Sequence, residues 1–486
     1  MQIIALTIIA IKQVIYKVCR YEFCQQKRFY DIYLSCVNKM EKYKFGTDGI
    51  RGKANEELTP EIAFRLGYVL GKRIPEGERL LVSKDTRESG DELALSAISG
   101  CLASGKDVDY IKVAATPISA FATTYLNYSY ALVITASHNI YSDNGLKVFK
   151  KNGLKLSDEE CQSIEQELTE NISYSKKIGK LFIKKNIKKK YINYLKKQNI
   201  NLDSLIVVLD EANGSLSNYA SKVFKLLNAK VKAINNKLNG QNINYKSGST
   251  NIEYLIKEKL NYLLPFDIGF SFDGDGDRVI SFLPDGSIID GDIEALLLVK
   301  LLRNNSGLIL TKMSDIAIIN YLKQSGINIS ISDVGDKNVY ELMNNSGCKI
   351  GAEKSGHIIL KDYMNSGDGL YNALLLASIF KKNKEEFYRV VKQIKASKKY
   401  EIEIITDNAK EVIKNSNFEK IAQKYDGLNE NKFVYRASGT ESKIRVLIQS
   451  LDEKELKEIY IEINEEIERL KEKYVWNSRN IVVKKS

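Results

Sequence analysis

The chain has 486 residues and is basic overall, with 73 Lys and Arg residues against 61 Asp and Glu residues, a formal net charge of +12. A chain of this length should fold into about three or four domains, and it has no apolar run of about 18 residues that would predict a membrane span. Its six cysteines show neither metal-binding spacing nor a disulfide framework, so we expect reduced thiols and a cytoplasmic location.

The first 39 residues differ from the rest of the chain, because they hold three of the six cysteines and begin with an apolar run that no basic residue precedes. A signal peptide needs a positively charged start and a small-residue cleavage site, so this segment makes a poor one. Our hypothesis is that translation starts at Met40 and that residues 1–39 come from an over-extended reading frame.

Strand-like and helix-like segments alternate along most of the chain. Predicted strands lie at 80–83, 110–113, 130–135, 205–209, 308–311 and 327–332. Predicted helices lie at 91–104, 217–227, 314–324 and 337–345, and another begins at Thr116-Pro117, where Thr116 would be the cap. Alternation of this kind predicts an α/β fold with mixed or parallel sheets covered by helices. The tail from about residue 398 instead indicates an α+β unit, which ends in a helix at 453–474.

A polar turn, Thr135-Ala136-Ser137-His138-Asn139, follows the predicted strand 130–135 directly. A turn of small residues at the end of a strand should leave the Ser137 hydroxyl exposed to a ligand, with His138 beside it. Lys147 lies on the next strand. An acyl-transfer nucleophile is the alternative, but the Gly-x-Ser-x-Gly signature is absent and no partner acid is obvious.

The strongest basic cluster, residues 176–197, contains ten Lys and no acidic residue. Aromatic residues are interleaved with these lysines, so single-strand nucleic-acid binding is one interpretation. The chain has none of the usual nucleic-acid modules, and a Lys-rich composition produces such a face on any surface helix. We therefore expect no nucleic-acid partner; the positive field suits small anionic ligands better.

An acidic loop follows the apolar, strand-like run 266–272, with three carboxylates alternating with glycines: Asp273, Asp275 and Asp277. The alternation bends the backbone so that the three side chains can converge on one hard cation, Mg²⁺ or Ca²⁺. Arg278 adds a cation that could meet a phosphate. A Ca²⁺ helix-loop-helix hand fails because Arg278 and Pro284 stand where it needs Gly and Glu. A solvated acidic turn is the remaining alternative.

A phosphorylated Ser137 docked on this metal loop explains both motifs together. Mg²⁺ would offset the charge on the phosphoryl oxygens, and Lys147 could shuttle a proton at a sugar hydroxyl. The second of the two histidines, His357, lies in another short polar loop with Glu353 and Ser355. A lone histidine usually has a structural role, but its place in such a loop favours a functional one.

Five motifs in this order resemble those of the α-D-phosphohexomutases from about Met40 to the C-terminus: Phe45-Gly46-Thr47-Asp48-Gly49-Ile50-Arg51-Gly52, the Ser137 loop, the Asp273 loop, the Glu353 loop and Arg436-Ala437-Ser438-Gly439-Thr440-Glu441-Ser442. The resemblance implies a phosphoserine enzyme that interconverts sugar 6-phosphate and 1-phosphate through a bound 1,6-bisphosphate. It also implies four domains around a central cleft: three similar α/β domains with mixed sheets, at 40–182, 183–290 and 291–397, and a C-terminal α+β domain at 398–486.

The family's site residues carry over by position. Ser137 would be the phosphorylated residue and would ligate one Mg²⁺ together with Asp273, Asp275 and Asp277. The groups around the transferring phosphate would be Arg51, His138, Lys147 and Arg278, with Lys147 the general acid/base. Sugar hydroxyls would be bound by Glu353, Ser355 and His357. The other phosphate would be bound by Arg436, Ser438, Gly439, Thr440 and Arg445, a set whose hydroxyls, glycine and arginine forks also suit a dianion on chemical grounds.

The substrate is less well defined than the reaction. The first motif, Ala136 and the run Val334-Gly335-Asp336-Lys337 favour glucosamine phosphates, with the hexosamine 1,6-bisphosphate as intermediate. Lys354 departs from the pattern, since glucosamine-type enzymes typically carry Gln there. A phosphomannomutase/phosphoglucomutase is the alternative, followed by a homologue that binds sugar phosphates without turnover. We expect small-molecule sugar phosphates as partners, no membrane partner, and a monomer or homodimer.

Overall fold

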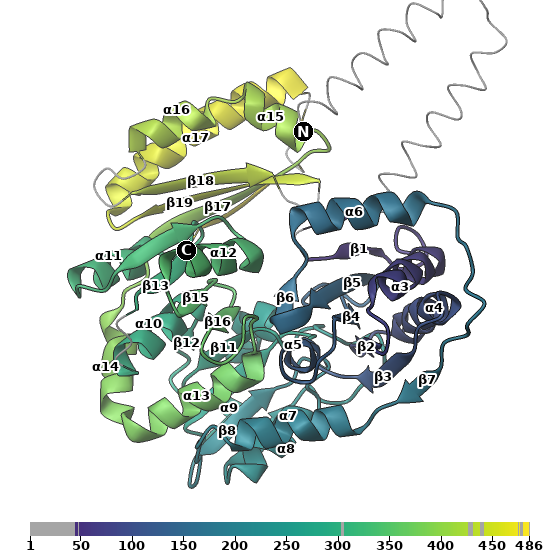
Figure 1. Cartoon of the computed structure of the whole chain (residues 1–486). Coiled ribbons are helices and arrows are strands. Elements are labelled where there is room, and N and C mark those ends of the chain that lie inside the picture. Colours follow the sequence, from purple (N-terminus) through teal and green to yellow (C-terminus); the bar gives the residue numbers. More distant parts are fainter. Residues whose placement is uncertain are drawn as a thin grey trace, which may run out of the picture.

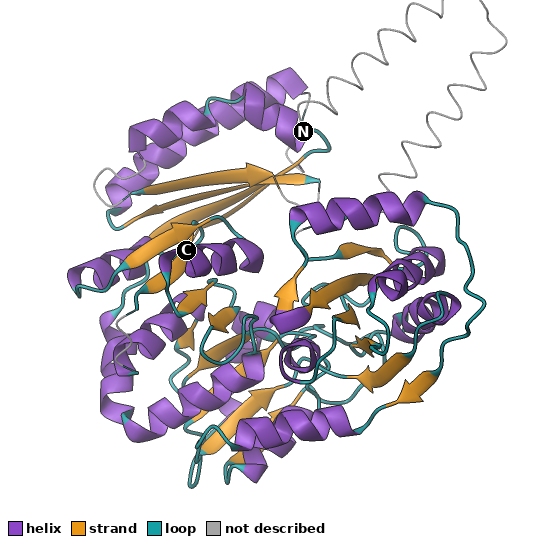
Figure 2. Ribbon diagram, viewed as in Figure 1, coloured by secondary structure: helices purple, strands orange, loops and turns teal. Residues whose placement is uncertain are grey.

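The computed structural model describes residues 44–46, 48–302, 306–425, 431–437, 442–474, 476 and 480–485. The hypothesis about residues 1–39 lies outside these ranges. Within them the chain forms four β-sheets, each flanked by helices (Figures 1 and 2), which confirms the predicted multi-domain α/β architecture. No helix among the described residues is both long enough and apolar enough to cross a membrane.

The first sheet is mixed. Its strands follow the order β1 (Ile50–Lys53), β5 (Asp143–Lys150), β4 (Tyr130–Ile134), β2 (Leu80–Lys84), β3 (Val108–Val113) and β7 (Leu181–Ile183), and β6 (Leu154–Lys155) pairs with β5. Its helices are α3 (Pro60–Arg73), α4 (Gly90–Ala103), α5 (Thr116–Tyr125) and α6 (Asp158–Thr169), with the short η1 (Lys151–Gly153). Strand β4 runs parallel to β2 and antiparallel to β5, so the Ser137 turn joins two neighbouring strands of this sheet.

The second sheet carries the acidic loop at one hairpin. Its order is β12 (Ile288–Ile289), β11 (Val279–Phe282), β10 (Ile268–Phe272), β8 (Ile206–Asp210) and β9 (Lys230–Ile234). The helices are α7 (Asn186–Lys196), α8 (Tyr219–Leu226) and α9 (Ile252–Leu263), with η2 (Ser249–Asn251) before α9. Since β10 and β11 are antiparallel neighbours, residues 273–278 form the tight connection between them.

The third sheet has the order β14 (Ile329–Ser332), β13 (Leu308–Thr311), β15 (Ile350–Ala352) and β16 (Ile358–Leu360). Around it lie α10 (Gly291–Leu301), α11 (Ile316–Gln324), α12 (Asp336–Ser346), α13 (Gly369–Lys382) and α14 (Lys384–Gln393). The Glu353 loop is the turn of the antiparallel pair β15–β16.

The fourth sheet confirms the predicted α+β tail. Its strands are β18 (Lys432–Ala437), β19 (Lys443–Ser450), β17 (Lys398–Ile405) and β20 (Ile481–Lys485), and each pairs antiparallel with its neighbours. The helices α15 (Ala409–Asn415), α16 (Phe418–Tyr425) and α17 (Glu453–Tyr474) lie together on one side of it (Figure 1).

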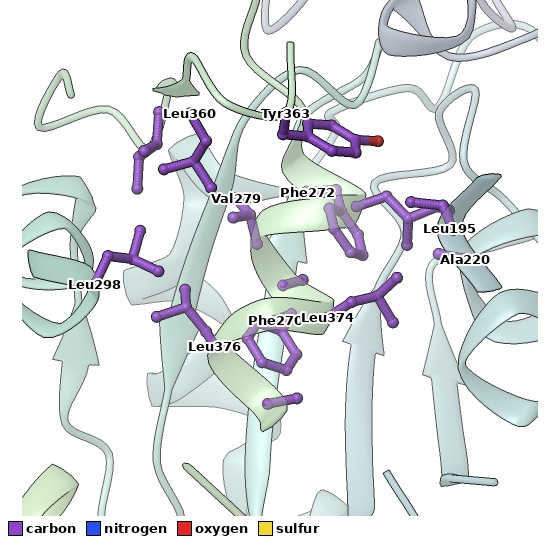
Figure 3. Close-up of a cluster of buried hydrophobic side chains, with 14 of the residues drawn as sticks. Leu195, Ala220, Phe270, Phe272, Val279, Leu298, Leu360, Tyr363, Leu374 and Leu376 are labelled. Atoms are coloured by element: carbon purple, nitrogen blue, oxygen red, sulfur yellow. The ribbon is translucent and has the colours of Figure 1, made fainter. Parts of the chain in front are cut away.

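The hydrophobic core differs between the first three sheets and the fourth. One continuous cluster includes Phe121 on α5 together with residues of the next two units. Figure 3 shows two of these, Phe270 on β10 and Leu374 on α13. The fourth unit has a cluster of its own, around Phe418 and Ile463. Each large buried side chain contributes about 1.5–3 kcal/mol, so separating the first three units would expose a shared core. Displacing the fourth unit would leave that shared core buried.

Candidate active site

The Ser137 turn is held in a strained conformation. Ser137 has φ +53°, a left-handed value that a non-glycine residue adopts only where its surroundings enforce it. Its backbone N–H donates to Thr135 Oγ1 at 2.9 Å, and the side-chain amide of Asn244 donates to its carbonyl at 2.8 Å. The expectation of an exposed hydroxyl was wrong, because Ser137 is fully buried where the first sheet's turn meets the acidic loop.

Arg87 holds this turn through hydrogen bonds to its carbonyl groups, and the sequence analysis did not identify this residue. Its guanidinium is fully buried and donates to the carbonyls of Ser137 at 3.1 Å and Asn139 at 2.9 Å, and also to those of Ile140 and Asp143. Its Nε donates to Asp85 at 2.9 Å. The polar run 85–87 directly after the buried strand β2, the neighbour of β4, is the signal that could have located it.

We therefore expect Arg87→Lys to lower kcat by about 100-fold while KM changes by less than about threefold, because a point ammonium cannot replace a fork of donors and Ser137 would shift slightly. Steady-state kinetics on protein that thermal unfolding shows to be folded would measure this. The matched control is Arg389→Lys at the exposed Arg389–Glu386 pair, which should have no effect. An unchanged kcat in folded Arg87→Lys would contradict the positioning role.

The three aspartates of the acidic loop converge as predicted. One ligand atom from each of Asp273, Asp275 and Asp277 lies within 4.8 Å of the others, and all three residues are buried. Burial, followed by the charges of its two neighbours, raises the pKa of Asp273 well above its usual range. Among the described residues, Asp275 Oδ1 and Asp277 Oδ1 are buried without a hydrogen-bond partner. Buried, crowded carboxylate oxygens of this kind fit a hard divalent cation.

Two hydroxyls reach the acidic loop from the first unit. Ser137 Oγ donates to Asp273 Oδ2 at 2.7 Å, and Thr116 Oγ1 donates to Asp275 Oδ2 at 2.6 Å. The prediction that Thr116 caps its helix was wrong by one residue: Ala115 occupies the cap position of α5, because the Thr116 hydroxyl is engaged with Asp275. Ser137 therefore touches the proposed metal loop directly, as the two motifs together suggested.

Lys147 is the cationic centre of the site. Its fully buried ammonium lies 2.9 Å from Asp275, 3.0 Å from Asp277 and 3.0 Å from Asp48. Burial lowers the pKa of Lys147, but the three carboxylates outweigh it and hold the pKa well above its ordinary value. Lys147 is therefore protonated here and can donate a proton.

Asp48 extends this network toward the third unit, and the sequence analysis assigned it no role. Its carboxylate pairs with Arg51 and Lys155 as well as with Lys147. Lys155 in turn lies 2.5 Å from Asp336 at the start of α12. A cavity of about 160 Å³ adjoins this pair and is lined in part by Tyr340.

His138 contacts the Ser137 hydroxyl, and Arg278 lies within electrostatic range of His138. His138 Nδ1 lies 3.4 Å from Ser137 Oγ. The charge of Arg278, then burial, then the charge of Arg51, lower the pKa of His138 to about 2, so its imidazole is neutral. Arg278 Nε lies 3.9 Å from Asp273 and 3.8 Å from Asp277, and it has no hydrogen-bond partner among the described residues. Its guanidinium is available to an anion.

The Glu353 loop packs closely against the acidic loop's own strand. Gly356 has φ +89°, and a Cβ there would lie 2.0 Å from the Val279 carbonyl oxygen, so only glycine fits. His357 reaches both ways, with Nδ1 3.6 Å from Asp277 and Nε2 3.5 Å from Asp336. Burial, although Arg278 and His357 oppose it, raises the pKa of Glu353. Ser355 is exposed at the tip of the loop.

Arg436 and Arg445 occupy directly opposite positions on β18 and β19. Burial and the charge of Arg445 lower the pKa of Arg436, whereas the charge of Glu353 raises it. Like charges opposite each other destabilise a strand pair, so the arrangement suits a bound dianion. Ser438, Gly439 and Thr440 lie outside the described residues.

The structure thus brings together side chains from the first three units: Arg51, Ser137, His138, Lys147, Asp273, Asp275, Asp277, Arg278, Glu353 and His357. Arg436 of the fourth unit lies within electrostatic range of Glu353. A buried hydroxyl, an acidic cluster and several cations can together support phosphoryl transfer, in which positioning and charge stabilisation supply most of the catalysis.

Comparisons with known proteins agree with this chemistry. Residues 42–175 match the family described as phosphoglucomutase/phosphomannomutase, alpha/beta/alpha domain I, and residues 290–397 match domain III of the same group. The chain is 37% identical over 447 residues to a phosphoglucosamine mutase of Clostridioides difficile, covering 86% of this chain and 97% of that protein. It is 36% identical over 429 residues to a phosphoglucosamine mutase of Staphylococcus aureus, covering 85% and 94%.

Solved structures share the fold. A phosphoglucomutase/phosphomannomutase family protein of Burkholderia thailandensis superposes with a TM-score of 0.74 at 22% identity, over 88% of this chain and 97% of that one. Aspergillus fumigatus N-acetylphosphoglucosamine mutase, solved with GlcNAc-6P and magnesium, gives 0.60 at 13% identity, over 88% and 96%. The chain belongs to the phosphoglucosamine mutase family of the α-D-phosphohexomutases, a family of isomerases that requires a metal cofactor, and its three aspartates could bind one.

Proposed function

We propose that this protein interconverts glucosamine 6-phosphate and glucosamine 1-phosphate through a phosphorylated Ser137 and a glucosamine 1,6-bisphosphate intermediate. The observation that carries the proposal is the 2.7 Å hydrogen bond from Ser137 Oγ to Asp273 within a cluster of three buried carboxylates. The relatives named phosphoglucosamine mutase, at 36–37% identity, support glucosamine phosphates as the substrate class.

In the first half-reaction the sugar hydroxyl attacks the phosphoryl group on Ser137, so the bond from phosphorus to Ser137 Oγ breaks and a bond to the sugar oxygen forms. One proton moves from the sugar hydroxyl to Ser137 Oγ, and Lys147 is the acid/base group that relays it. Mg²⁺ at Asp273, Asp275 and Asp277 would offset the negative charge that builds on the phosphoryl oxygens. Arg278 and Arg51 carry positive charge on the same side of the site. Neutral His138 can donate one N–H to the transferring group.

In the second half-reaction the bisphosphate turns around and its other phosphoryl group moves to Ser137. The sugar oxygen that is left needs a proton and Ser137 Oγ loses one, and Lys147 is the acid/base group that relays it from Ser137 to the sugar. The three carboxylates around Lys147 raise its pKa and so keep its ammonium protonated, which means that the proton this step needs is present on Lys147. Burial of Ser137 excludes water, whose attack on the phosphoserine is the competing reaction.

The remaining assignments concern the residues that bind the substrate and the boundaries of the domains. Glu353, Ser355 and His357 would bind sugar hydroxyls, and the Arg436–Arg445 pair with Ser438, Gly439 and Thr440 would bind the phosphate that does not react. We assign domains to 40–182, 183–290, 291–397 and 398–486. The separate core of the last unit supports a mechanism in which it opens to let the bisphosphate reorient.

The test is turnover of glucosamine 6-phosphate, mannose 6-phosphate and glucose 6-phosphate side by side, with Mg²⁺ and a trace of the matching 1,6-bisphosphate. We expect kcat/KM for the amino sugar to exceed that for either neutral hexose by at least about tenfold, or ~1.4 kcal/mol. A preference for mannose or glucose phosphate would make the protein a phosphomannomutase/phosphoglucomutase and leave the catalytic assignments in place.

A further inference from the structure

Lys354 is the residue of the sugar-contacting loop whose position the sequence left unexplained. It follows Glu353 directly, yet its ammonium points to two acidic residues at the starts of helices. Lys354 Nζ lies 3.6 Å from Asp290 Oδ2 and 3.5 Å from Asp315 Oδ2. The backbone is held in the same direction, because the N–H of Gly291 donates to the Lys354 carbonyl at 3.1 Å.

Asp315 connects this contact to the start of the fourth unit. Its Oδ1 accepts the Ala317 N–H at 2.9 Å, which caps α11, and the Ser397 N–H at 3.2 Å. Ser397 is buried and immediately precedes β17, the first strand of the fourth sheet. One carboxylate therefore touches the sugar loop through Lys354 and the linker between the third and fourth units through Ser397.

The same short segment meets the fourth sheet itself. The N–H of Ile316 donates to the side chain of Gln449 on β19 at 3.2 Å. Lys432 Nζ on β18 donates to the Ser314 carbonyl at 2.7 Å. Figure 1 shows α11 next to this sheet. Residues 314–316 therefore form a contact between the third and fourth units, and Lys354 binds it from the sugar-loop side.

Several acidic residues surround the Lys354 ammonium, so a positive charge is required at this position. Asp292 is fully buried and its Oδ2 accepts the Asp315 N–H at 2.8 Å. Burial, followed by the charge of Asp290, raises the pKa of Asp292 to about 7. The two buried acids, Asp292 and Asp315, depend most on this ammonium, since a buried charge left without a partner is costly.

We propose that Lys354 is a positioning residue that fixes the Glu353–Ser355–His357 loop to the junction with the fourth unit through Asp290 and Asp315, so that affinity for the sugar phosphate depends on it and sugar selectivity does not. The proposal deepens the proposed function and rests on it for the identity of the substrate. In this arrangement the position of the Glu353 loop and the position of Arg436 and Arg445 on the fourth unit depend on each other.

The experiment compares Lys354→Met, Lys354→Arg and the double variant Lys354→Gln with Asp315→Asn. The matched control is Lys349→Met, which breaks the exposed Lys349–Asp362 pair on the same sheet. For Lys354→Met we expect KM for glucosamine 6-phosphate to rise about tenfold and kcat to change less than about threefold, because the loop loses its two acidic partners while the groups around Ser137 keep theirs. Lys354→Arg and the double variant, which restore a partner for the loop, should stay within about threefold of wild type.

A second readout does not require turnover. Hydrogen exchange of the segment 394–400 should be about tenfold faster in Lys354→Met than in wild type or Lys349→Met, because Asp315 no longer holds the Ser397 N–H firmly. A merely structural defect would lower the folded fraction, and hence kcat, and would leave KM unchanged. Because hydrogen exchange needs no substrate, it tests the contact between Lys354 and the fourth unit even if glucosamine 6-phosphate is not the substrate.

Two results would overturn the proposal. A change of more than about fivefold in the ratio of kcat/KM between glucosamine 6-phosphate and glucose 6-phosphate would make Lys354 a specificity residue. Unchanged KM together with unchanged exchange of residues 394–400 in folded Lys354→Met would show that the loop is positioned without it.

Discussion

Replacing Ser137 with Ala should abolish mutase turnover, with a loss of about 10⁴-fold or more, because no other group can carry the phosphoryl group in the proposed mechanism. Binding of the sugar phosphate should change by less than about threefold, since the contacts assigned to the sugar and to the second phosphate lie in other loops. Coupled-assay kinetics and calorimetric titration with glucosamine 6-phosphate would measure the two effects separately.

The same variant has a chemical signature. Intact-mass and peptide analysis should find phosphate on Ser137 of the wild-type protein after incubation with the 1,6-bisphosphate, and none at this position in Ser137→Ala. Ser346→Ala, at the exposed end of α12, is the control and should behave as wild type. Retention of wild-type turnover by Ser137→Ala would rule out the phosphoserine assignment.

Replacing Asp275 with Asn should weaken the metal site. The substitution keeps the shape of the side chain and its ability to accept from Thr116, but it removes a negative charge from the cluster. We expect the Mg²⁺ concentration for half-maximal activity to rise by about 100-fold and kcat at saturating Mg²⁺ to fall by at least about 10-fold. Lys147 should stay buried and charged, because Asp277 and Asp48 still pair with it.

Direct Mn²⁺ or Mg²⁺ titration of the two proteins would report the loss of affinity without any dependence on turnover. Asp285→Asn removes one carboxylate from the exposed turn between β11 and β12 and is the matched control. Removal of the metal with a chelator should silence the wild-type enzyme, and added Mg²⁺ should restore it. An Asp275→Asn protein with unchanged metal affinity would count against the acidic loop as the metal site.

Much of the fold could be predicted because its signals are local. The strands at β2, β4 and β13 are short apolar runs, and the helix α17 spans the predicted residues 453–474. The convergence of Asp273, Asp275 and Asp277 could be predicted as well, because their glycine-separated spacing forces a turn. Exposure could not be predicted: Ser137 lies in a polar turn of small residues, and whether such a turn faces solvent depends on which unit packs on it.

Residues that act through contacts distant in sequence were not identified from their own segments. Arg87 contacts carbonyl oxygens about fifty residues later in the chain, and Thr116 reaches an aspartate 159 residues away. Asp48, Lys155 and Asp336 form one charge network, although no local pattern in the sequence relates the three segments that carry them. Lys354 was linked to substrate identity because glucosamine-type enzymes typically carry Gln at this position; in space it is turned toward Asp290 and Asp315.

The sequence by itself determined the reaction class, the alternating α/β organisation and the identity of the chemical groups, because ordered motifs and local spacing specify which side chains a turn can bring together. Only the tertiary structure decided how those groups are buried, paired and positioned. The physical reason is that burial, ion pairing and the setting of each pKa depend on contacts between sheets, and those contacts join residues that no local pattern relates.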